Sequence, residues 1–291
     1  MKKTEFTISG ITVCMNTPWE EKISENFVPF LGSGGNVEYE AIFCERTELK
    51  KATSLPVFQN TGYAVYRDEE GNYLRYFHSL PSMREPYAMT RVDFLNKKVY
   101  VDYLLGKEWC FGSQQKDFYY LGWENLLLQE NQLIFHAACV NTSMGGILFS
   151  GPSGIGKSTQ ADLWCRFANG RLLNGDRPIL AKREDGWNAY GSPYAGSSEC
   201  YVNEKKRIKA IVLLKQAETC SIQKKNTLEA FREIYAQMTV NNWDKKAVSK
   251  VSNLVMDLIT EIPVYELACT PDIEAVKMLQ NTLEQEEDSW I

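Results

Sequence analysis

The chain contains little histidine and no excess of basic residues, and both shortages limit what it binds. Only two of its 291 residues are histidines, and 32 lysines and arginines face 37 aspartates and glutamates, giving a net charge of -5. Proteins that hold nucleic acid through their surface potential carry clustered positive charge. We therefore expect no nucleic-acid partner.

Long apolar segments and paired cysteines are also missing. No run reaches the about 18 apolar residues of a membrane helix, and the first residues, "MKKTEFTISGITVC", alternate like a strand and lack the apolar core of a signal peptide. The eight cysteines are scattered, with no C-x-x-C pair. These features predict a cytoplasmic protein with reduced cysteines, no membrane partner and no structural zinc.

The first part of the chain has the pattern of a β domain. Short runs rich in Tyr, Phe, Val and Thr alternate with a period of two and are separated by turns such as "GSGG" at 32–35 and "DEEGN" at 68–72. Such runs are typical of half-buried strands. The pattern predicts an antiparallel β domain over residues 1–115.

From residue 116 to 291 the pattern changes to strands mixed with helices. Residues 117–131 have apolar positions at helical spacing and predict one connecting helix. The runs "LIFHAACV" and "GGILFS" are almost continuously apolar, as in strands covered on both faces. The second domain is therefore expected to be α/β with a mixed sheet, which makes the whole chain α/β in class, or α+β overall.

A glycine-rich loop joins one buried strand to the next helix. Its sequence, Gly151-x4-Gly156-Lys157-Ser158, satisfies the phosphate-binding loop pattern in the required strand-to-helix context. Glycines let backbone N–H groups turn toward phosphate oxygens, the lysine reaches the β- and γ-phosphates, and the serine hydroxyl can bind Mg²⁺. The residues expected to hold the phosphates of ATP are Gly151, Ser153, Gly154, Ile155, Gly156, Lys157, Ser158 and Thr159.

Together with its surroundings, this loop resembles the catalytic domain of the HPr kinase/phosphorylase family. The segments that carry the resemblance are "FHAACVNTSMGGILFSGPSGIGKSTQADLW" and "GRLLNGDRPIL". The family has a P-loop core similar to that of phosphoenolpyruvate carboxykinase. The resemblance covers roughly residues 130–215 well and the C-terminal helices loosely, and it does not reach the N-terminal domain.

The resemblance implies roles for four residues. It gives His136 a place near the transferred phosphate, and it aligns Asp176 with the second aspartate of a pair that serves the metal and the acceptor hydroxyl. Gly175 stands where the family has the first aspartate, which leaves the catalytic base and the reversibility of the reaction open. Arg177 follows Asp176, as an arginine often does in the family.

Structural alternatives exist for each of these residues. A lone histidine in an apolar strand, such as His136, is often a core residue. Asp176 is either a Mg²⁺ ligand or a turn residue, and Arg177 either neutralises transition-state charge or forms a surface ion pair. The segment "YGSPYAGS" at 190–197 either lines the acceptor pocket or is a structural turn.

The expected function is ATP- and Mg²⁺-dependent phosphorylation of a hydroxyl, on a serine of a small protein, a peptide or an amino acid. Lys157, Asp176, His136 and Arg177 are the expected catalytic residues, with Ser158 and Asp176 as metal ligands. The β domain is expected to recognise the acceptor or to mediate homo-oligomerisation. Two alternatives remain, a catalytically inactive nucleotide-binding regulatory protein and a carboxykinase-type lyase.

Overall fold

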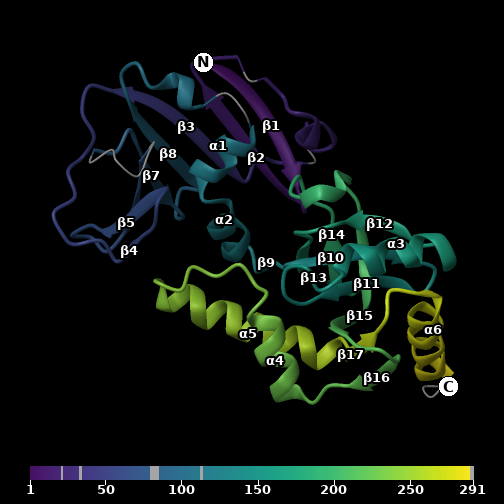
Figure 1. The fold of residues 1–291 in the computed structure, drawn as a ribbon. Helices are drawn as coiled ribbons and strands as arrows, with labels where there is room; N and C mark the ends of the chain where they lie inside the picture. The colour runs from purple at the N-terminus through teal and green to yellow at the C-terminus, as the bar shows by residue number, and fades with distance from the viewer. Residues whose placement is uncertain (21, 33–34, 79–84, 112–113, 289–291) are drawn as a thin grey trace. The chain divides into compact units, whose positions relative to one another are not determined.

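The chain divides into two compact units, Met1–Leu126 and Leu127–Ile291. The computed structural model describes residues 1–20, 22–32, 35–78, 85–111 and 114–288 (Figure 1). The sequence pattern predicts a boundary after residue 115, whereas helix α1 (Gln114–Leu121) spans this point and belongs to the N-terminal unit. Aromatic packing explains this placement, because Phe118 lies fully buried with its ring centroid 5.5 Å from Phe6 and 4.9 Å from Phe27.

One mixed sheet forms the N-terminal unit, with strand order β1-β2-β3-β8-β7-β6-β5-β4. Side chains on its strands alternate between buried and accessible positions, most regularly in β3 and β8. The strands are β1 (Lys2–Ile8), β2 (Ile11–Thr17), β3 (Tyr39–Arg46), β4 (Phe58–Gln59), β5 (Tyr63–Arg67), β6 (Tyr73–Phe77), β7 (Ala88–Asp93) and β8 (Lys98–Leu104), with 3₁₀ turns at Glu25–Phe30 and Glu108–Cys110.

The prediction of a purely antiparallel domain is wrong at two strand pairs. Strand β3 runs parallel to both of its neighbours, β2 and β8, while the other pairs of this sheet are antiparallel. Alternation with a period of two is the same in both arrangements, so it does not report strand direction. The direction of β3 is set by a long connection from β2, which the local pattern does not reveal.

Two helices, not one, occupy the predicted connecting segment. Helix α1 (Gln114–Leu121) ends just before Gly122, and α2 (Trp123–Gln129) begins just after this glycine. Gly122 has a φ of 67°, in the left-handed region that ends helices and favours glycine. The periodicity of the apolar residues therefore predicts the helical content correctly but misses the break.

The C-terminal unit is a mixed sheet with helices on both faces. Its strand order is β12-β10-β11-β15-β14-β13-β9, and β17 pairs with β15 and with β16. The strands are β9 (Gln132–Ile134), β10 (Ala137–Thr142), β11 (Gly145–Ser150), β12 (Arg171–Asn174), β13 (Ile179–Arg183), β14 (Gly186–Tyr190), β15 (Lys205–Gln216), β16 (Ser221–Lys224) and β17 (Val264–Cys269). The helices are α3 (Lys157–Phe167), α4 (Thr227–Tyr235), α5 (Lys245–Glu261) and α6 (Ile273–Asp288), with a 3₁₀ turn at Gly196–Ser198.

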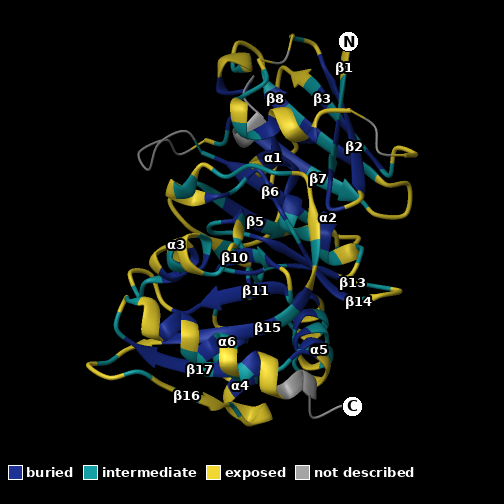
Figure 2. Ribbon diagram, turned by 90° about the vertical axis from the view of Figure 1, so that its right-hand side faces the viewer, coloured by how far each residue is buried: buried dark blue, intermediate teal, exposed yellow. Residues whose placement is uncertain are grey.

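Successive residues of β10 show how the two faces are covered. Ala137 and Cys139 pack in one apolar core with residues of α4 and α5, while Ala138 and Val140 pack in a second core with residues of α3 and α6. Figure 2 shows the resulting dark-blue central strands, β11, β15 and β17, beneath helices whose outer faces are exposed. Strand β11 is parallel to β15 and antiparallel to β10, so the α/β prediction with a mixed sheet is confirmed.

Across the described residues, the structure contains no helix of the length and hydropathy that a membrane span requires.

Helix α5 offers a test of the first core. Leu258 is fully buried there, whereas Met256 on the same helix is 42% exposed. Leu258→Ala is expected to lower the free energy of unfolding by about 2–5 kcal/mol, because it removes a buried side chain and leaves a cavity. Met256→Ala is the control and should change it by less than about 1 kcal/mol. Guanidinium denaturation of both variants measures the difference, and equal losses would contradict the packing described.

Candidate functional site

Strand register brings the glycine-rich loop, His136 and Asp176 to one edge of the sheet. Strand β10 is antiparallel to both β11 and β12, with Ala137 opposite Ser150 and Cys139 opposite Asn174. The beginning of β10 therefore lies beside the ends of β11 and β12, where the loop and the segment with Asp176 start. Two hydrogen bonds reinforce this edge, from Ser150 Oγ to the His136 carbonyl (2.8 Å) and from Ala137 N–H to the Asp176 carbonyl (3.0 Å).

The loop wraps through three left-handed glycines. Gly151, Gly154 and Gly156 have φ angles of 140°, 79° and 112°. A Cβ atom on Gly154 or Gly156 would meet nothing within 4 Å, so the backbone conformation, not crowding, requires glycine at these two positions. A glycine-rich loop of this kind at the beginning of a helix can turn backbone N–H groups toward an anion.

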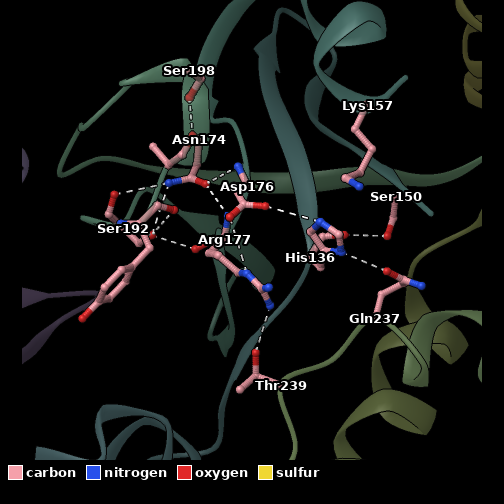
Figure 3. A network of polar contacts seen from close by, with 12 residues as sticks. His136, Ser150, Lys157, Asn174, Asp176, Arg177, Ser192, Ser198, Gln237 and Thr239 are labelled. Carbon is pink, nitrogen blue, oxygen red and sulfur yellow. Dashed lines mark hydrogen bonds and ion pairs between the residues drawn. The ribbon is translucent and has the colours of Figure 1, made fainter. Parts of the chain in front are cut away.

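Lys157 folds back over this loop. Its side chain is buried, and Nζ donates hydrogen bonds to the carbonyls of Gly151 (3.0 Å) and Pro152 (3.2 Å). Burial lowers the pKa of the Lys157 ammonium, the charge of Asp176 raises it and that of Arg177 lowers it. In Figure 3 the amine points toward His136, beyond which Asp176 lies.

The remaining predicted phosphate ligands lie along the same stretch. Ser153, Gly154, Ser158 and Thr159 are exposed, and Ile155 and Gly156 are partly buried. Ser158 is thus exposed at the first turn of α3, and the side chain of Asp176 is one-third exposed. One hydroxyl and one carboxylate fit Mg²⁺, because this ion keeps several waters and takes its other ligands from substrate phosphates.

His136 lies between Asp176 and Gln237 (Figure 3). Its Nε2 is 3.4 Å from Oδ1 of Asp176, and its Nδ1 is 3.0 Å from Oε1 of Gln237. Because an amide oxygen only accepts, Nδ1 carries the proton in this contact, and the neutral ring turns the Nε2 lone pair toward the carboxylate. Nε2 of the neutral ring and Oδ1 of Asp176 are both hydrogen-bond acceptors, so either atom could take up a proton that enters between them.

The surroundings of His136 favour its neutral form. Burial lowers the pKa of the imidazole below its ordinary value of 6.5, and the charges of Lys157 and Arg177 lower it further. The hydrogen bond with Gln237 and the charge of Asp176 act in the opposite direction. A neutral histidine beside a carboxylate can accept a proton at neutral pH.

A buried asparagine holds Asp176 and Arg177 in place. Oδ1 of Asn174 accepts hydrogen bonds from the backbone N–H groups of Asp176 (3.0 Å) and Arg177 (2.7 Å), and its Nδ2 donates to Ser192 Oγ at 3.2 Å. Ser192 is fully buried and donates from Oγ to the Arg177 carbonyl at 2.7 Å. In the segment 190–197, Ser192 is therefore part of a structural turn and is not exposed to an acceptor.

Arg177 is tied to its neighbours. Its Nε lies 3.6 Å from Oδ2 of Asp176, and its Nη1 donates to Oγ1 of Thr239 at 3.3 Å. The structure thus brings together all four predicted catalytic residues, and it places Arg177 in an ion pair with the carboxylate. Asn174, Gln237 and Thr239 were missed from the sequence. Asn174 lies in the segment "GRLLNGDRPIL", which carries the family resemblance. Gln237 and Thr239 lie between α4 and α5, in a segment without a sequence motif.

Comparisons with known proteins give little further information. No family model matches the chain, and no curated protein does. Among solved structures, it is similar to the HPr(Ser) kinase/phosphatase from Coxiella burnetii, with 13% identity and a TM-score of 0.32 over 54% of this chain and 95% of that one. A TM-score this low supports no conclusion about function, so the description of the site depends only on the residues of this chain.

The hydrogen bonds of Asn174 can be tested through amide exchange. Asn174→Ala removes the acceptor of two backbone N–H groups and should cost about 1–3 kcal/mol in the free energy of unfolding. It should also speed hydrogen exchange at the amides of Asp176 and Arg177. The exposed Asn253→Ala on α5 is the control and should change neither. Unchanged exchange at both amides in Asn174→Ala would contradict the arrangement.

The contact with Gln237 predicts a signed change in the titration of His136. Gln237→Leu removes a hydrogen bond that favours the imidazolium, so the pKa of His136 should fall further below 6.5. Gln237→Glu places a carboxylate at the same position and should raise it. Proton NMR of the two histidines measures both shifts, with the signal of His78, in the N-terminal unit, as the reference. Shifts of the same sign in both variants would show that Gln237 does not face the ring.

Proposed function

We propose that the C-terminal unit is a kinase that transfers the γ-phosphoryl group of ATP to a hydroxyl, with Mg²⁺. The acceptor proposed is a serine of a small protein or peptide, or a free amino acid. The observation that carries this proposal is the position of the glycine-rich loop, whose lysine lies at the same sheet edge as the Asp176–His136 pair. The resemblance of the sequence to HPr kinases points in the same direction.

The phosphate side of the reaction would depend on the loop and Lys157. Backbone N–H groups of Gly151 and of residues 153–158 would hold the β- and γ-phosphates, and Lys157 would exchange its loop carbonyls for phosphate oxygens. Ser158 and Asp176 would hold Mg²⁺, which would supply charge neutralisation at the phosphates. Phosphoryl transfer needs mainly such positioning and charge neutralisation.

The acceptor side would depend on Asp176 and His136. The carboxylate of Asp176 would orient the incoming hydroxyl. The proton of this hydroxyl would pass to Oδ1 of Asp176 or to Nε2 of His136, two atoms that lie 3.4 Å apart. Because the local environment favours the neutral ring, His136 is able to accept this proton near neutral pH. Arg177, 3.6 Å from Oδ2, would keep the carboxylate oriented.

A second candidate is a nucleotide-binding regulatory protein without transfer activity. Gly175 favours it, because no carboxylate stands at the position where the family has its first aspartate. Single-turnover transfer from ATP labelled at the γ-phosphate distinguishes the two. Label on serine peptides or free serine supports the kinase, whereas tight ATP binding without transfer to any acceptor or to water supports the regulator.

Removing the charge of Lys157 tests the phosphate site. Lys157→Met keeps the length of the buried side chain and should lower ATP turnover at least about 100-fold, because it removes a cation that stabilises developing phosphate charge. Lys277→Met, at an exposed position of α6, should leave turnover unchanged. Initial rates and melting temperatures of both variants are the measurements. Native turnover in a folded Lys157→Met protein would refute the role of the loop.

A further inference from the structure

A short serine-bearing turn lies directly against the proposed acceptor side of the site. It follows β14 and comprises Ala195 and the 3₁₀ turn Gly196–Ser198. Its first residue, Gly196 (φ 58°), and the residue after it, Glu199 (φ 50°), have left-handed backbone conformations. The buried Ser192, bonded to Asn174 and to the Arg177 carbonyl, fixes the chain just before the turn.

The last residue of this turn fills the space beside Gly175. A Cβ atom on Gly175 would lie 2.5 Å from Ser198 Cβ and 3.0 Å from the Ala195 carbonyl oxygen, and it would collide with Ser198 Oγ. No side chain fits at position 175 while the turn is docked. The glycine that replaces an aspartate of the resembling family is therefore what lets this segment of the chain reach the site.

Gly196, at the other end of the turn, packs on Asp176 itself. A Cβ atom on Gly196 would lie 3.0 Å from Asp176 Cβ, 3.3 Å from Cγ and 3.5 Å from Oδ2. The carboxylate thus has His136 on the Oδ1 side and the turn on the Oδ2 side. The side chain of Ser198 lies against Gly175, the residue that precedes this carboxylate.

We propose that the chain carries its own acceptor, and that Ser198 is phosphorylated in cis by the site of the C-terminal unit. This inference rests on the proposed kinase function. Ser198 is partly buried against Gly175, whereas its neighbour Ser197 is exposed. Ser198 is therefore the serine of the turn that the fold holds at the site.

The transfer step balances with groups already named. Ser198 Oγ, which donates a hydrogen bond to the Ala195 carbonyl at 2.6 Å, gives up that bond and attacks the γ-phosphorus of ATP. The bond between this phosphorus and the oxygen bridging to the β-phosphate breaks, and ADP leaves with the electron pair. The hydroxyl proton passes to Asp176 or to Nε2 of His136.

Phosphorylation would then change access to the site. A phosphoserine carries a charge of about -1.5 to -2 at neutral pH, and beside a carboxylate such a charge repels. The modified turn leaves Asp176 and Gly175, which opens the acceptor side to a hydroxyl of another molecule. The turn thus acts as a covalent gate.

Phosphate incorporation into the full-length chain tests the proposal. The phosphatase-treated protein is incubated with Mg²⁺ and ATP labelled at the γ-phosphate, and the modified residue is mapped by mass spectrometry. We expect up to one phosphate per chain on Ser198, with a rate constant independent of protein concentration. Ser198→Ala should reduce the incorporation to background, whereas Ser197→Ala, the matched control, should retain it.

Gly175→Ala tests the same contact without removing the hydroxyl. It pushes the turn away from Asp176 and should slow incorporation roughly 100-fold, as misplacement of a reacting group by about 1 Å does. Label on Ser197 or elsewhere, or a rate proportional to protein concentration, would overturn the assignment.

Binding of a fluorescent ATP analogue and phosphorylation of added serine peptides distinguish failure of the cis acceptor from failure of the proposed kinase function. Nucleotide binding and peptide phosphorylation without label on Ser198 would refute the cis acceptor alone. Absence of nucleotide binding would refute the proposed kinase as well.

Discussion

The antiparallel register of β10 with β11 and β12 is the constraint on which the whole site depends. It turns the beginning of one strand toward the ends of two others, so His136, the glycine-rich loop and Asp176 meet at one edge although they are far apart in sequence. The register is in turn fixed by burial, because Ala137 and Cys139 face one core while Ala138 and Val140 face the other. A slip by one residue would exchange the two faces.

Electrostatics at this edge follow from the same arrangement. Asp176 carries the negative charge at the centre, with Arg177 3.6 Å from one oxygen and the His136 ring 3.4 Å from the other. Partial burial and the nearby cations Lys157 and Arg177 lower the pKa of His136, which favours a neutral ring that can accept a proton. The lysine, for its part, is held by two loop carbonyls, whose place a phosphate oxygen can take.

The sequence alone predicts those parts of the structure that depend on neighbouring residues in the chain. The glycine-rich loop, the buried strands around it and the α/β class follow from glycine positions and apolar runs. The direction of β3 and the break at Gly122 did not, because periodicity alone reports neither strand direction nor a left-handed glycine. The long-range contacts of Asn174 and Gln237 also remained hidden, since their partners are set by the tertiary fold. From the sequence, Gly175 is only a glycine at the position where the resembling family has an aspartate. The tertiary structure explains the glycine, because Ser198 packs against it and leaves no room for a side chain.

A crystal structure of the protein with Mg²⁺ and a non-hydrolysable ATP analogue tests the central claim most directly. The claim predicts the β- and γ-phosphates among the backbone N–H groups of Gly151 and residues 153–158, Lys157 Nζ on a phosphate oxygen, and the γ-phosphate facing Asp176 and His136. A nucleotide bound elsewhere, with this loop and the Lys157 contacts to Gly151 and Pro152 unchanged at saturating concentration, would contradict it.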